Sequence, residues 1–477
     1  MKWLEFLTDL FNRNSQSMDT VRHGSKYGER SYFRMFNCDG TQFQTDALAD
    51  LTSAQKKKFV INNNRMPAGF TYFGQFVDHD ITKLKRGSEI PGEGPIPEDE
   101  LVQERTPSLD LDSLYGDGLT DNVVQYRNGQ FHSDSKIGSD DDFTILDLPR
   151  NDKKIAQIAD GRNDENLIVA RLHVLFMNLH NKLFRRRREA SIEARFEATR
   201  QEVTLIYQSI ILNDFLPRIL HPKVHVLLVP QPGFQPWTDV VRGSAPRVPI
   251  EFAVAAYRFG HALVRNSYKI GTDLTTFTLH DLFRNTGKGG LDGHPSTAHI
   301  NLDWSLFFEV SPDTSPQKSL SITTRPTPAL ADMINEKAGN KDLTDRNLKR
   351  GSELALPCAQ DCIEQVKKDR PDLYGHFLMP AIDPASGHVL ADELKRWGME
   401  KKTPLWTYIL MEPAYLERPY GHRVLGNLGS FIVAETFRSL FMTSRISHFF
   451  REEIDQPFEF FKNQHTMAEV ISFVQSH

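Results

Sequence analysis

Side chains suited to acid–base chemistry are concentrated in one short segment of the chain. His79 lies between Asp78 and Asp80, and Gln75 lies four residues before His79. Most of the neighbouring side chains are aromatic or aliphatic, which indicates that these polar groups lie inside a core. A buried histidine beside carboxylates is costly unless each group has a partner. A surface turn is the alternative, but the apolar setting favours a site in which His79 transfers protons.

A second polar segment, Gly-Arg-Asn-Asp-Glu-Asn, occupies residues 161–166. It stands at the start of a long helix, which is predicted from leucine and isoleucine residues that step by three and four over 168–183. Arg162 and Glu165 can therefore lie on one side of the first turn. By itself this pattern is weak.

A third segment, Ala-Tyr-Arg-Phe-Gly-His at residues 256–261, places Arg258 and His261 one turn apart on a largely apolar helix. A single histidine in such a helix is more often a hydrogen-bonded core residue than a metal ligand. The segment 347–360 ends in Gln360, a side chain that is well suited to hold a histidine ring.

Helical periodicity dominates the rest of the chain, so the fold is expected to be mainly α, with few short strands and long loops. We expect an N-terminal arm over residues 1–55 and a single large domain over residues 56–470. The predicted helices lie at 168–183, 196–215, 250–266, 343–368 and 428–442, and one of the short strand signals lies at 224–229.

Composition excludes several classes of protein. The formal net charge is −5 and the pI is about 6.4, so there is no electrostatic case for nucleic acid as the main partner. The three cysteines argue against a disulfide framework. The chain has no run of eighteen apolar residues, so no transmembrane segment is expected. No signal peptide is seen either, which leaves cytoplasm and non-standard secretion open.

Together, in this order and spacing, these segments resemble the animal-type haem peroxidases of the peroxidase–cyclooxygenase superfamily, which has bacterial members. The resemblance runs from about residue 60 to about residue 450. It includes the landmarks Leu-Pro-Arg-Ile-Leu at 216–220 and Leu-Gly-Asn-Leu-Gly-Ser at 425–430. It implies a helical haem-peroxidase domain that binds haem b, reduces hydrogen peroxide and oxidises small donors through a ferryl iron.

The resemblance also assigns roles to the polar side chains. His79 is implied to be the distal base and His261 the proximal iron ligand. Arg162 is implied to stabilise the charge that develops on the departing oxygen. Gln75 matches the residue that positions small ligands above the iron. Iodide, bromide, thiocyanate and phenolic compounds are the donors that the resemblance suggests, in keeping with a role in the response to oxidative stress.

Other implied roles concern the attachment of the haem. Asp78 and Glu165 match two carboxylates that form ester bonds to haem in mammalian members; a buried pair of hydrogen-bonded acids is the alternative. Asn166 stands where some members carry a methionine that makes a third covalent link. That link is impossible here, so we expect a less oxidising iron and doubt efficient chloride oxidation. Arg258 matches an arginine that pairs with a haem propionate.

Gln360 falls where mammalian members place an asparagine that accepts the proximal imidazole proton. The change to glutamine lengthens this side chain. A neutral amide would leave His261 a less electron-rich ligand than a carboxylate partner would.

A calcium site is implied beside the distal base. Asp80 and the segment 106–112 resemble the calcium site of the family, in which several oxygens surround a hard cation. Thr106, Asp110 and Asp112 are expected to offer side-chain oxygens together with Asp80, and Ser108 its backbone carbonyl. Asp112 stands where mammalian members usually have serine. An acidic surface turn is the alternative.

Two other functions stay open. Fatty-acid dioxygenases of the same superfamily keep a radical-forming tyrosine three residues before the proximal histidine. Arg258 occupies that position here, and Tyr257 comes one residue too early. The third possibility is a haem-free binding protein that keeps only the fold, and the intact set of polar residues argues against it.

Overall fold

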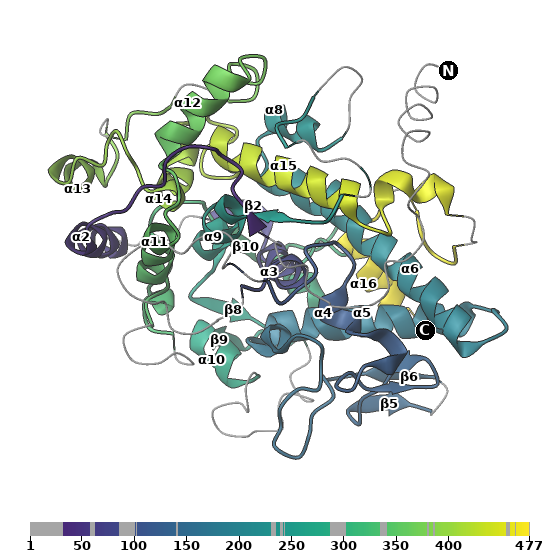
Figure 1. Ribbon diagram of the computed structural model, residues 1–477. Coiled ribbons are helices and arrows are strands. Elements are labelled where there is room, and N and C mark those ends of the chain that lie inside the picture. Colours follow the sequence, from purple (N-terminus) through teal and green to yellow (C-terminus); the bar gives the residue numbers. More distant parts are fainter. Residues whose placement is uncertain are drawn as a thin grey trace.

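Helices dominate the computed structural model, and α3, which carries His79, lies near the middle of the view in Figure 1. The prediction of a mainly α fold is confirmed. The structure describes residues 32–476 except for 58–62, 85–100, 102, 140–141, 230–234, 239–241, 243, 287–301, 334–340, 379–380, 385–386, 455–457 and 463.

The helices are named as in Figure 1. The α-helices are α2 (Thr45–Lys56), α3 (Gly69–Ile81), α4 (Asp112–Tyr115), α5 (Leu167–Arg186), α6 (Ile192–Ile210), α7 (Leu216–Ile219), α8 (Pro222–His225), α9 (Ile250–Val254), α10 (Leu279–Arg284), α11 (Leu343–Glu353), α12 (Ala359–Asp369), α13 (Ala391–Arg396), α14 (Leu405–Met411), α15 (Asn427–Thr443) and α16 (Met467–Gln475). The 3-10 helices are η2 (Gly118–Thr120), η3 (Gly161–Asp164), η5 (Val226–Leu228), η6 (Ala256–Leu263), η7 (Trp304–Leu306), η8 (Pro328–Ala331), η9 (Glu412–Tyr415) and η10 (His448–Glu453), and η4 (Ile211–Phe215) is π-helical.

Strands form only two-stranded pairs in the described part of the chain. One pair, β1 with β7, is parallel, and the others are antiparallel. The pairs are β1 (Tyr32–Phe33) with β7 (Val248–Pro249), β2 (Asn63–Pro67) with β10 (Lys318–Leu320), β3 (Tyr126–Arg127) with β4 (Gln130–Phe131), β5 (Lys136–Gly138) with β6 (Phe143–Ile145), and β8 (Ser267–Lys269) with β9 (Thr276–Thr278).

Three of the predicted helices are confirmed. The helices predicted at 168–183 and 428–442 are α5 and α15, and the one at 196–215 is α6 followed by η4. The Asn166 side chain begins α5 by accepting a hydrogen bond from the Val169 N–H, and Arg185 and Arg186 lie in its last turn. Both features stabilise the ends of a helix.

The helix predicted at 250–266 is broken. α9 ends at Val254, Ala255 leaves helical geometry, and the chain continues as the 3-10 helix η6. Nε of Arg258 donates to the Ala253 carbonyl at 2.8 Å, an oxygen that an unbroken α-helix would use for its own ladder.

The helix predicted at 343–368 is also broken, into α11 and α12. Ala355, between them, has a φ of 46°. The Arg34 guanidinium donates to the carbonyls of Leu354 and Ala355 at 2.8 and 3.0 Å, so this distant side chain satisfies the end of α11.

The strand predicted at 224–229 is wrong. The segment is helical, as α8 and η5. Pro222 occupies the first turn of α8, and the His221 ring accepts a hydrogen bond from the Lys223 N–H at 3.3 Å. Proline at this position favours a helix start.

Much of the expected N-terminal arm, residues 1–31, lies outside the described residues. The described part is not separate from the core. Tyr32, Phe36, Leu48 and Leu51 are buried in the same apolar cluster as the helices of the domain. The boundary at residue 55 falls at the end of α2 and stays a prediction.

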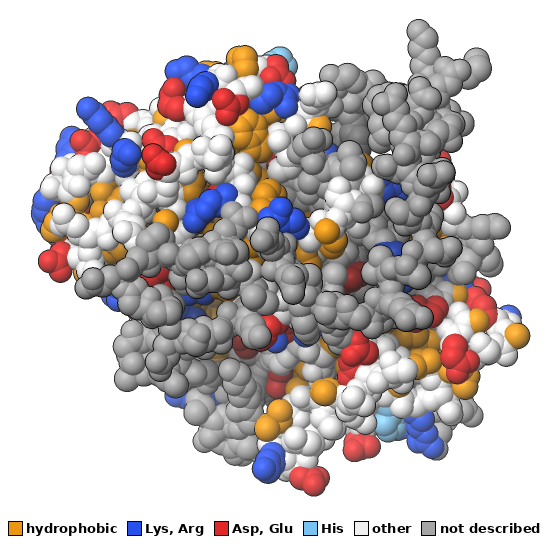
Figure 2. All heavy atoms as spheres, in the orientation of Figure 1, with side chains coloured by type: hydrophobic (Ala, Val, Ile, Leu, Met, Phe, Trp, Pro, Cys, Tyr) orange, Lys and Arg blue, Asp and Glu red, His pale blue; other side chains and the backbone are white. Residues whose placement is uncertain are grey.

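Acidic and basic side chains are interspersed among the described residues on the face shown in Figure 2. Among the described residues, no helix is both long enough and apolar enough to cross a bilayer.

Candidate active site

The polar segment around His79 forms the last turn of α3. Asp78, His79 and Asp80 are buried, with exposed fractions of 7%, 4% and 0%. The helix approaches its neighbours closely at Gly69, where an added Cβ would lie 2.4 Å from the Phe308 ring. Thr82, the residue that follows α3, donates from its hydroxyl to the Asp78 carbonyl and carboxylate at 3.1 and 2.9 Å. The predicted burial of this polar turn is therefore confirmed.

One ring nitrogen of His79 is fixed by hydrogen bonding. Nδ1 lies 2.9 Å from Oδ1 of Asn163, and Nδ2 of the same amide lies 3.1 Å from Nδ1 of His173. With the Asn163 amide in this orientation, Oδ1 can only accept, so Nδ1 of His79 carries the hydrogen and Nε2 keeps its lone pair. Burial, followed by the charge of Arg162, lowers the pKa of His79 to about 4. A neutral His79 is therefore available as a base at pH 7.

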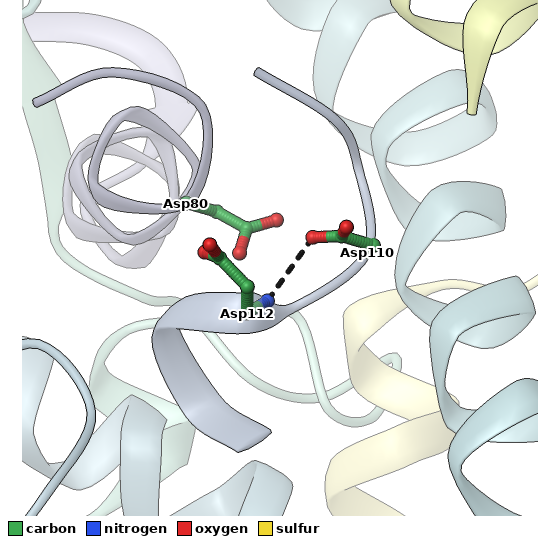
Figure 3. Close-up of side chains that lie close together, drawn as sticks. All are labelled: Asp80, Asp110 and Asp112. Atoms are coloured by element: carbon green, nitrogen blue, oxygen red, sulfur yellow. Dashed lines mark hydrogen bonds between the residues drawn. The ribbon is translucent and has the colours of Figure 1, made fainter. Parts of the chain in front are cut away.

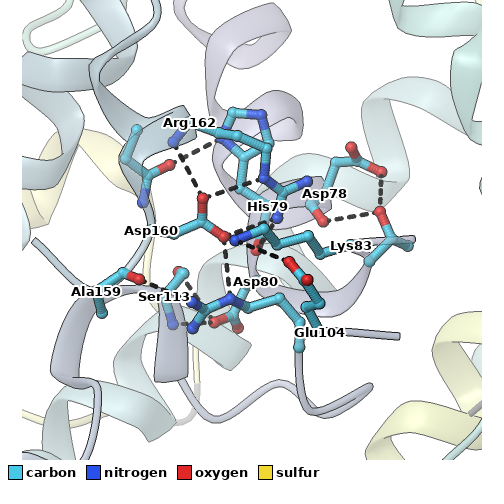
Figure 4. A network of polar contacts seen from close by, with 12 residues as sticks. Asp78, His79, Asp80, Lys83, Glu104, Ser113, Ala159, Asp160 and Arg162 are labelled. Atoms are coloured by element: carbon cyan, nitrogen blue, oxygen red, sulfur yellow. Dashed lines mark hydrogen bonds and ion pairs between the residues drawn. The ribbon is translucent and has the colours of Figure 1, made fainter. Parts of the chain in front are cut away.

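Arg162 lies beside His79 and is held by Asp160. Its Nε and Nη2 donate to the two oxygens of Asp160 at 3.1 and 2.8 Å, and Nη2 also donates to the His79 carbonyl at 2.9 Å (Figure 4). Burial opposes the charge, but the hydrogen bonds and charge of Asp160 raise the pKa of Arg162. The arrangement keeps a cation next to the base.

Gln75 and Glu165 lie near this pair. The Asn166 amide donates to Oε1 of Gln75 at 3.0 Å, while its own oxygen caps α5. Asn166 therefore joins the start of α5 to the middle of α3. The Glu165 charge acts on Arg162, and Gln75 is linked to the same segment through Asn166.

His261 lies on η6, which packs against α3. Its Nδ1 lies 2.9 Å from Nδ2 of Asn347, on α11. An amide can present its nitrogen or, turned by half a turn, its oxygen. Only in the second orientation, in which the amide oxygen accepts from the Nδ1–H, does Nε2 keep the lone pair that a metal ligand needs. Burial, followed by the charge of Arg258, lowers the pKa of His261 to about 3.

The prediction that Gln360 holds the proximal ring is wrong. Its Nε2 donates to the Glu400 carbonyl and the Thr403 hydroxyl at 3.1 and 2.9 Å, and its Oε1 accepts from the Thr403 N–H at 2.9 Å. The break between α11 and α12 separates Gln360 from α11, and Asn347 is the residue that reaches His261.

Arg258 contacts Asp78 and stays partly exposed to solvent. Its Nη1 lies 3.4 Å from Oδ2 of Asp78, so the residue predicted to bind a propionate faces one predicted to bind the haem edge. Asp78 also acts electrostatically on both His79 and His261. One carboxylate thus lies within electrostatic reach of both histidines.

Two observations test whether this region suits a haem. The Tyr257 hydroxyl is buried without a hydrogen-bond partner, and it would lie 3.8 Å from a Cβ added at Gly74 of α3. At Gly260, no atom lies within 4 Å of the position of an added Cβ. A buried polar group without a partner and open space beside His261 fit a cofactor bound between η6 and α3.

Three carboxylates lie close together at the end of α3, next to His79. Ligand oxygens of Asp80, Asp110 and Asp112 all lie within 4.8 Å of one another (Figure 3). Burial, followed by the charge of Asp112, raises the pKa of Asp80 to about 7, and burial and the neighbouring carboxylates raise that of Asp110. Acids that raise one another's pKa in this way suit a hard cation.

The other predicted cation ligands lie on the same segment. The Thr106 N–H donates to Asp112 at 3.1 Å. The Ser108 hydroxyl contacts that of Ser444 at 3.1 Å, and the predicted ligand atom of Ser108, its backbone carbonyl, takes no part in this contact.

Sequence reasoning missed four residues that organise the site, namely Asp160, Asn163, His173 and Asn347. Asp160 and Asn163 flank Arg162 closely in sequence, so a polar pair around a buried arginine was a usable signal. His173 and Asn347 carried none, because only the folded chain brings them near their partners.

Comparison with known proteins defines the class. The model of the animal haem peroxidase family matches residues 90–475. The chain therefore belongs to the animal haem peroxidase family, and membership implies a haem cofactor.

Curated relatives are similar over part of their length. The chain is 24% identical to "Peroxidase mlt-7" of Caenorhabditis elegans over 272 residues, which cover 54% of this chain and 35% of that protein. It is 31% identical to thyroid peroxidase of Rattus norvegicus over 221 residues, covering 42% and 21% respectively. The chain thus spans about a third or less of these relatives.

Solved structures share the fold. Peroxidase A from Dictyostelium discoideum aligns with a TM-score of 0.62 at 16% identity, covering 95% of this chain and 94% of that one. A fatty acid alpha-dioxygenase from Oryza sativa aligns with a TM-score of 0.60 at 13% identity, covering 85% and 76%.

Proposed function

We propose that the protein is a haem peroxidase that reduces hydrogen peroxide and oxidises small donors. One observation carries the proposal. His79 is buried beside the cation of Arg162, its Nδ1 lies 2.9 Å from Oδ1 of Asn163, and burial lowers its pKa to about 4, which favours the neutral ring at pH 7. This combination suits the removal of a proton from peroxide and its return to the departing oxygen.

The chain's own groups have separate tasks in this proposal. His79 Nε2 accepts the proton of peroxide, and Arg162 stabilises the negative charge on the oxygen that departs. Asn163 keeps the ring in one tautomer throughout. Gln75, fixed by Asn166, would orient the small ligand. Haem, when bound, supplies the redox-active iron.

Several residues would hold the haem. Nε2 of His261 is the candidate iron ligand, with Asn347 on the other nitrogen. Arg258 can exchange its 3.4 Å contact with Asp78 for a propionate. Asp78 and Glu165 are the candidates for ester bonds. Extraction with acidified solvent tests the bonds, because only covalently held pigment stays with the protein.

Calcium is the cation that we propose for the three aspartates. Asp80, Asp110 and Asp112 would supply charged oxygens, with the Thr106 hydroxyl and the Ser108 carbonyl completing the set. Because Asp80 follows His79 directly on α3, a bound cation would fix the end of that helix.

The donors would be iodide, bromide, thiocyanate or phenols. The Asn166 amide nitrogen donates to Gln75, and its oxygen caps α5. Asparagine cannot form the third covalent link to haem that a methionine makes in some members, so chloride oxidation should be inefficient.

A visible spectrum of the purified protein tests the proposal. The protein, as isolated or after addition of hemin, should show a Soret band that changes within seconds of adding peroxide and returns on adding iodide or a phenol. A colourless protein that takes up no hemin would contradict it.

A fatty-acid dioxygenase is the second candidate, and the Tyr257 hydroxyl favours it. This hydroxyl is buried without a partner, one residue before Arg258 and four before His261. Two alpha-dioxygenases, from Oryza sativa and Arabidopsis thaliana, share the fold, and one structure of the rice enzyme is of a tyrosine-to-phenylalanine variant with palmitic acid. Oxygen uptake with linoleate or palmitate, without added peroxide, would support this function.

A further inference from the structure

Arg105 lies between the three-aspartate cluster and the distal pair. Its Nη1 lies 3.3 Å from Oδ1 of Asp112 and donates to the Asp112 carbonyl at 3.2 Å. Its Nε lies 3.0 Å from Oδ2 of Asp160, and its Nη2 donates to the Ala159 carbonyl at 2.8 Å. The side chain is only 8% exposed, so these contacts are shielded from water.

Asp160 is the acid that Arg105 shares with Arg162. It is fully buried, and Arg162 donates to it from the backbone N–H, Nε and Nη2 at 3.0, 3.1 and 2.8 Å. Burial opposes its ionisation, but the hydrogen bonds and charge of Arg162, with the charge of Arg105, hold the pKa of Asp160 below its usual range. Figure 4 shows Asp160 between Arg162 and the contacts around Asp80.

Asp112 is in turn shared between Arg105 and the cluster. Its carboxylate approaches those of Asp80 and Asp110 and also faces Arg105. A guanidinium is planar and rigid, so it can contact two acids at once, and a shift toward one acid draws it from the other. The contacts run without a break from Asp112 through Arg105 and Asp160 to Arg162.

We propose that Arg105 is a positioning residue that couples occupancy of the three-aspartate cluster to the placement of Arg162 beside His79. This inference rests on the proposed function for its use in peroxide reduction, but the coupling itself needs no haem. A cation that draws Asp112 into the cluster loosens the contact between Asp112 and Arg105. Arg105 can then move closer to Asp160. Coupling between two sites is reciprocal, so a change at Arg162 must alter cation affinity.

A double-mutant cycle on calcium affinity tests the coupling without haem. Calorimetric titration with calcium would be run on wild type, Arg162→Gln, Arg105→Gln and the double variant. With Arg105 present, Arg162→Gln frees Asp160 to draw Arg105 away from Asp112, so calcium should bind at least about fivefold more tightly. With Gln at position 105, the same change should leave affinity within about twofold.

Arg105→Lys covers the case in which Arg105→Gln fails to fold. It keeps the charge, but a single ammonium does not bridge both acids, so the coupling should also shrink. An equal shift in both backgrounds, no shift with Arg105 present, or no calcium binding by wild type would overturn the proposal.

Arg150→Gln is the matched control. Arg150 is 12% exposed and forms two 2.8 Å hydrogen bonds with Asp164, on the same turn η3 as Arg162. This variant also loses a buried Arg–Asp pair, so it reports general loosening of η3. It should leave the response of calcium affinity to Arg162→Gln intact, and loss of that response here would overturn the specific role of Arg105.

Cyanide binding by the haem-loaded protein tests the consequence at the distal pair. Hydrogen cyanide gives up a proton to a base before its anion binds iron, so its association rate reports His79 and Arg162 together. Arg105→Gln removes one of the two cations that fix Asp160, so Arg162 is held less precisely and association should slow about tenfold. Arg150→Gln should change the association rate far less. Equal slowing in the two variants would overturn the role of Arg105. A positive calcium cycle in a protein that binds no cyanide would support the coupling and contradict the proposed function.

Discussion

The two sides of the candidate haem site are built differently. On the distal side, His79 is tied to Asn163, and Arg162 is tied to Asp160 by two side-chain hydrogen bonds. On the proximal side, the His261 ring is hydrogen-bonded to the neutral amide of Asn347, and the nearby Arg258 contacts Asp78 only at 3.4 Å.

This difference matches two different tasks. A proton-transfer group must keep one tautomer and one position, which a network of buried hydrogen bonds and charges provides. A metal ligand held by a neutral amide donates less electron density than one held by a carboxylate. The distal side therefore holds its base in one position, and the proximal side limits the electron density that His261 can donate.

The largest effect should come from His261→Ala. Loss of the candidate iron ligand should abolish retention of haem, because the chain offers no other imidazole at this place in η6. The ratio of Soret absorbance to protein absorbance measures it. Full pigment content in this variant would remove the distinction between the two sides.

Asn347→Ala should have the next largest effect. Removal of a hydrogen-bond partner of a metal-bound histidine typically costs about 10–100-fold in metal affinity or activity. Hemin titration and peroxide turnover would show it. Gln360→Ala is the control: its contacts are with Glu400 and Thr403, so it should leave hemin affinity close to wild type.

The pH dependence separates the distal group from the rest. The pKa of His79 is lowered to about 4, so the base is neutral above that pH and becomes protonated below it. The rate constant for reaction with peroxide should stay level from pH 7 to about pH 5. Below about pH 4 it should fall tenfold per unit. A midpoint near 6.5 would indicate an exposed histidine.

Calcium removal should have the smallest effect. A cation at about 100 times its dissociation constant stabilises a protein by about 2.7 kcal/mol, which corresponds to a melting temperature that falls by a few degrees on chelation. Without the cation, the raised pKa of Asp80, about 7, favours the protonated carboxyl in the folded state. Stability of the calcium-free protein should therefore fall as pH rises from about 4 to about 7, and calcium should remove that trend.

The distal side could be predicted from sequence because its residues are local. His79 and its acids share one helical turn, and Arg162 and Glu165 lie within four residues of each other, so apolar periodicity places each set. The long helices α5 and α15 were predictable for the same reason. Asp160 and Asn163 needed only attention to the neighbours of Arg162.

The proximal side depends on contacts between distant segments. The break after α11 rests on Arg34, more than 300 residues earlier, which binds the carbonyls of Leu354 and Ala355. Periodicity within 343–368 contains no sign of this contact, so the helix was expected to continue and Gln360 was placed at the wrong site. Tertiary contacts overrode local propensity there.

Stopped-flow absorbance with hydrogen peroxide, on wild type and His79→Ala loaded to equal haem content, tests the central claim most directly. Loss of the base should slow the reaction by roughly 10²- to 10⁴-fold while the pigment stays bound. A rate within a few-fold of wild type, or pigment loss in proportion to the rate, would contradict the assignment of His79 as the distal base.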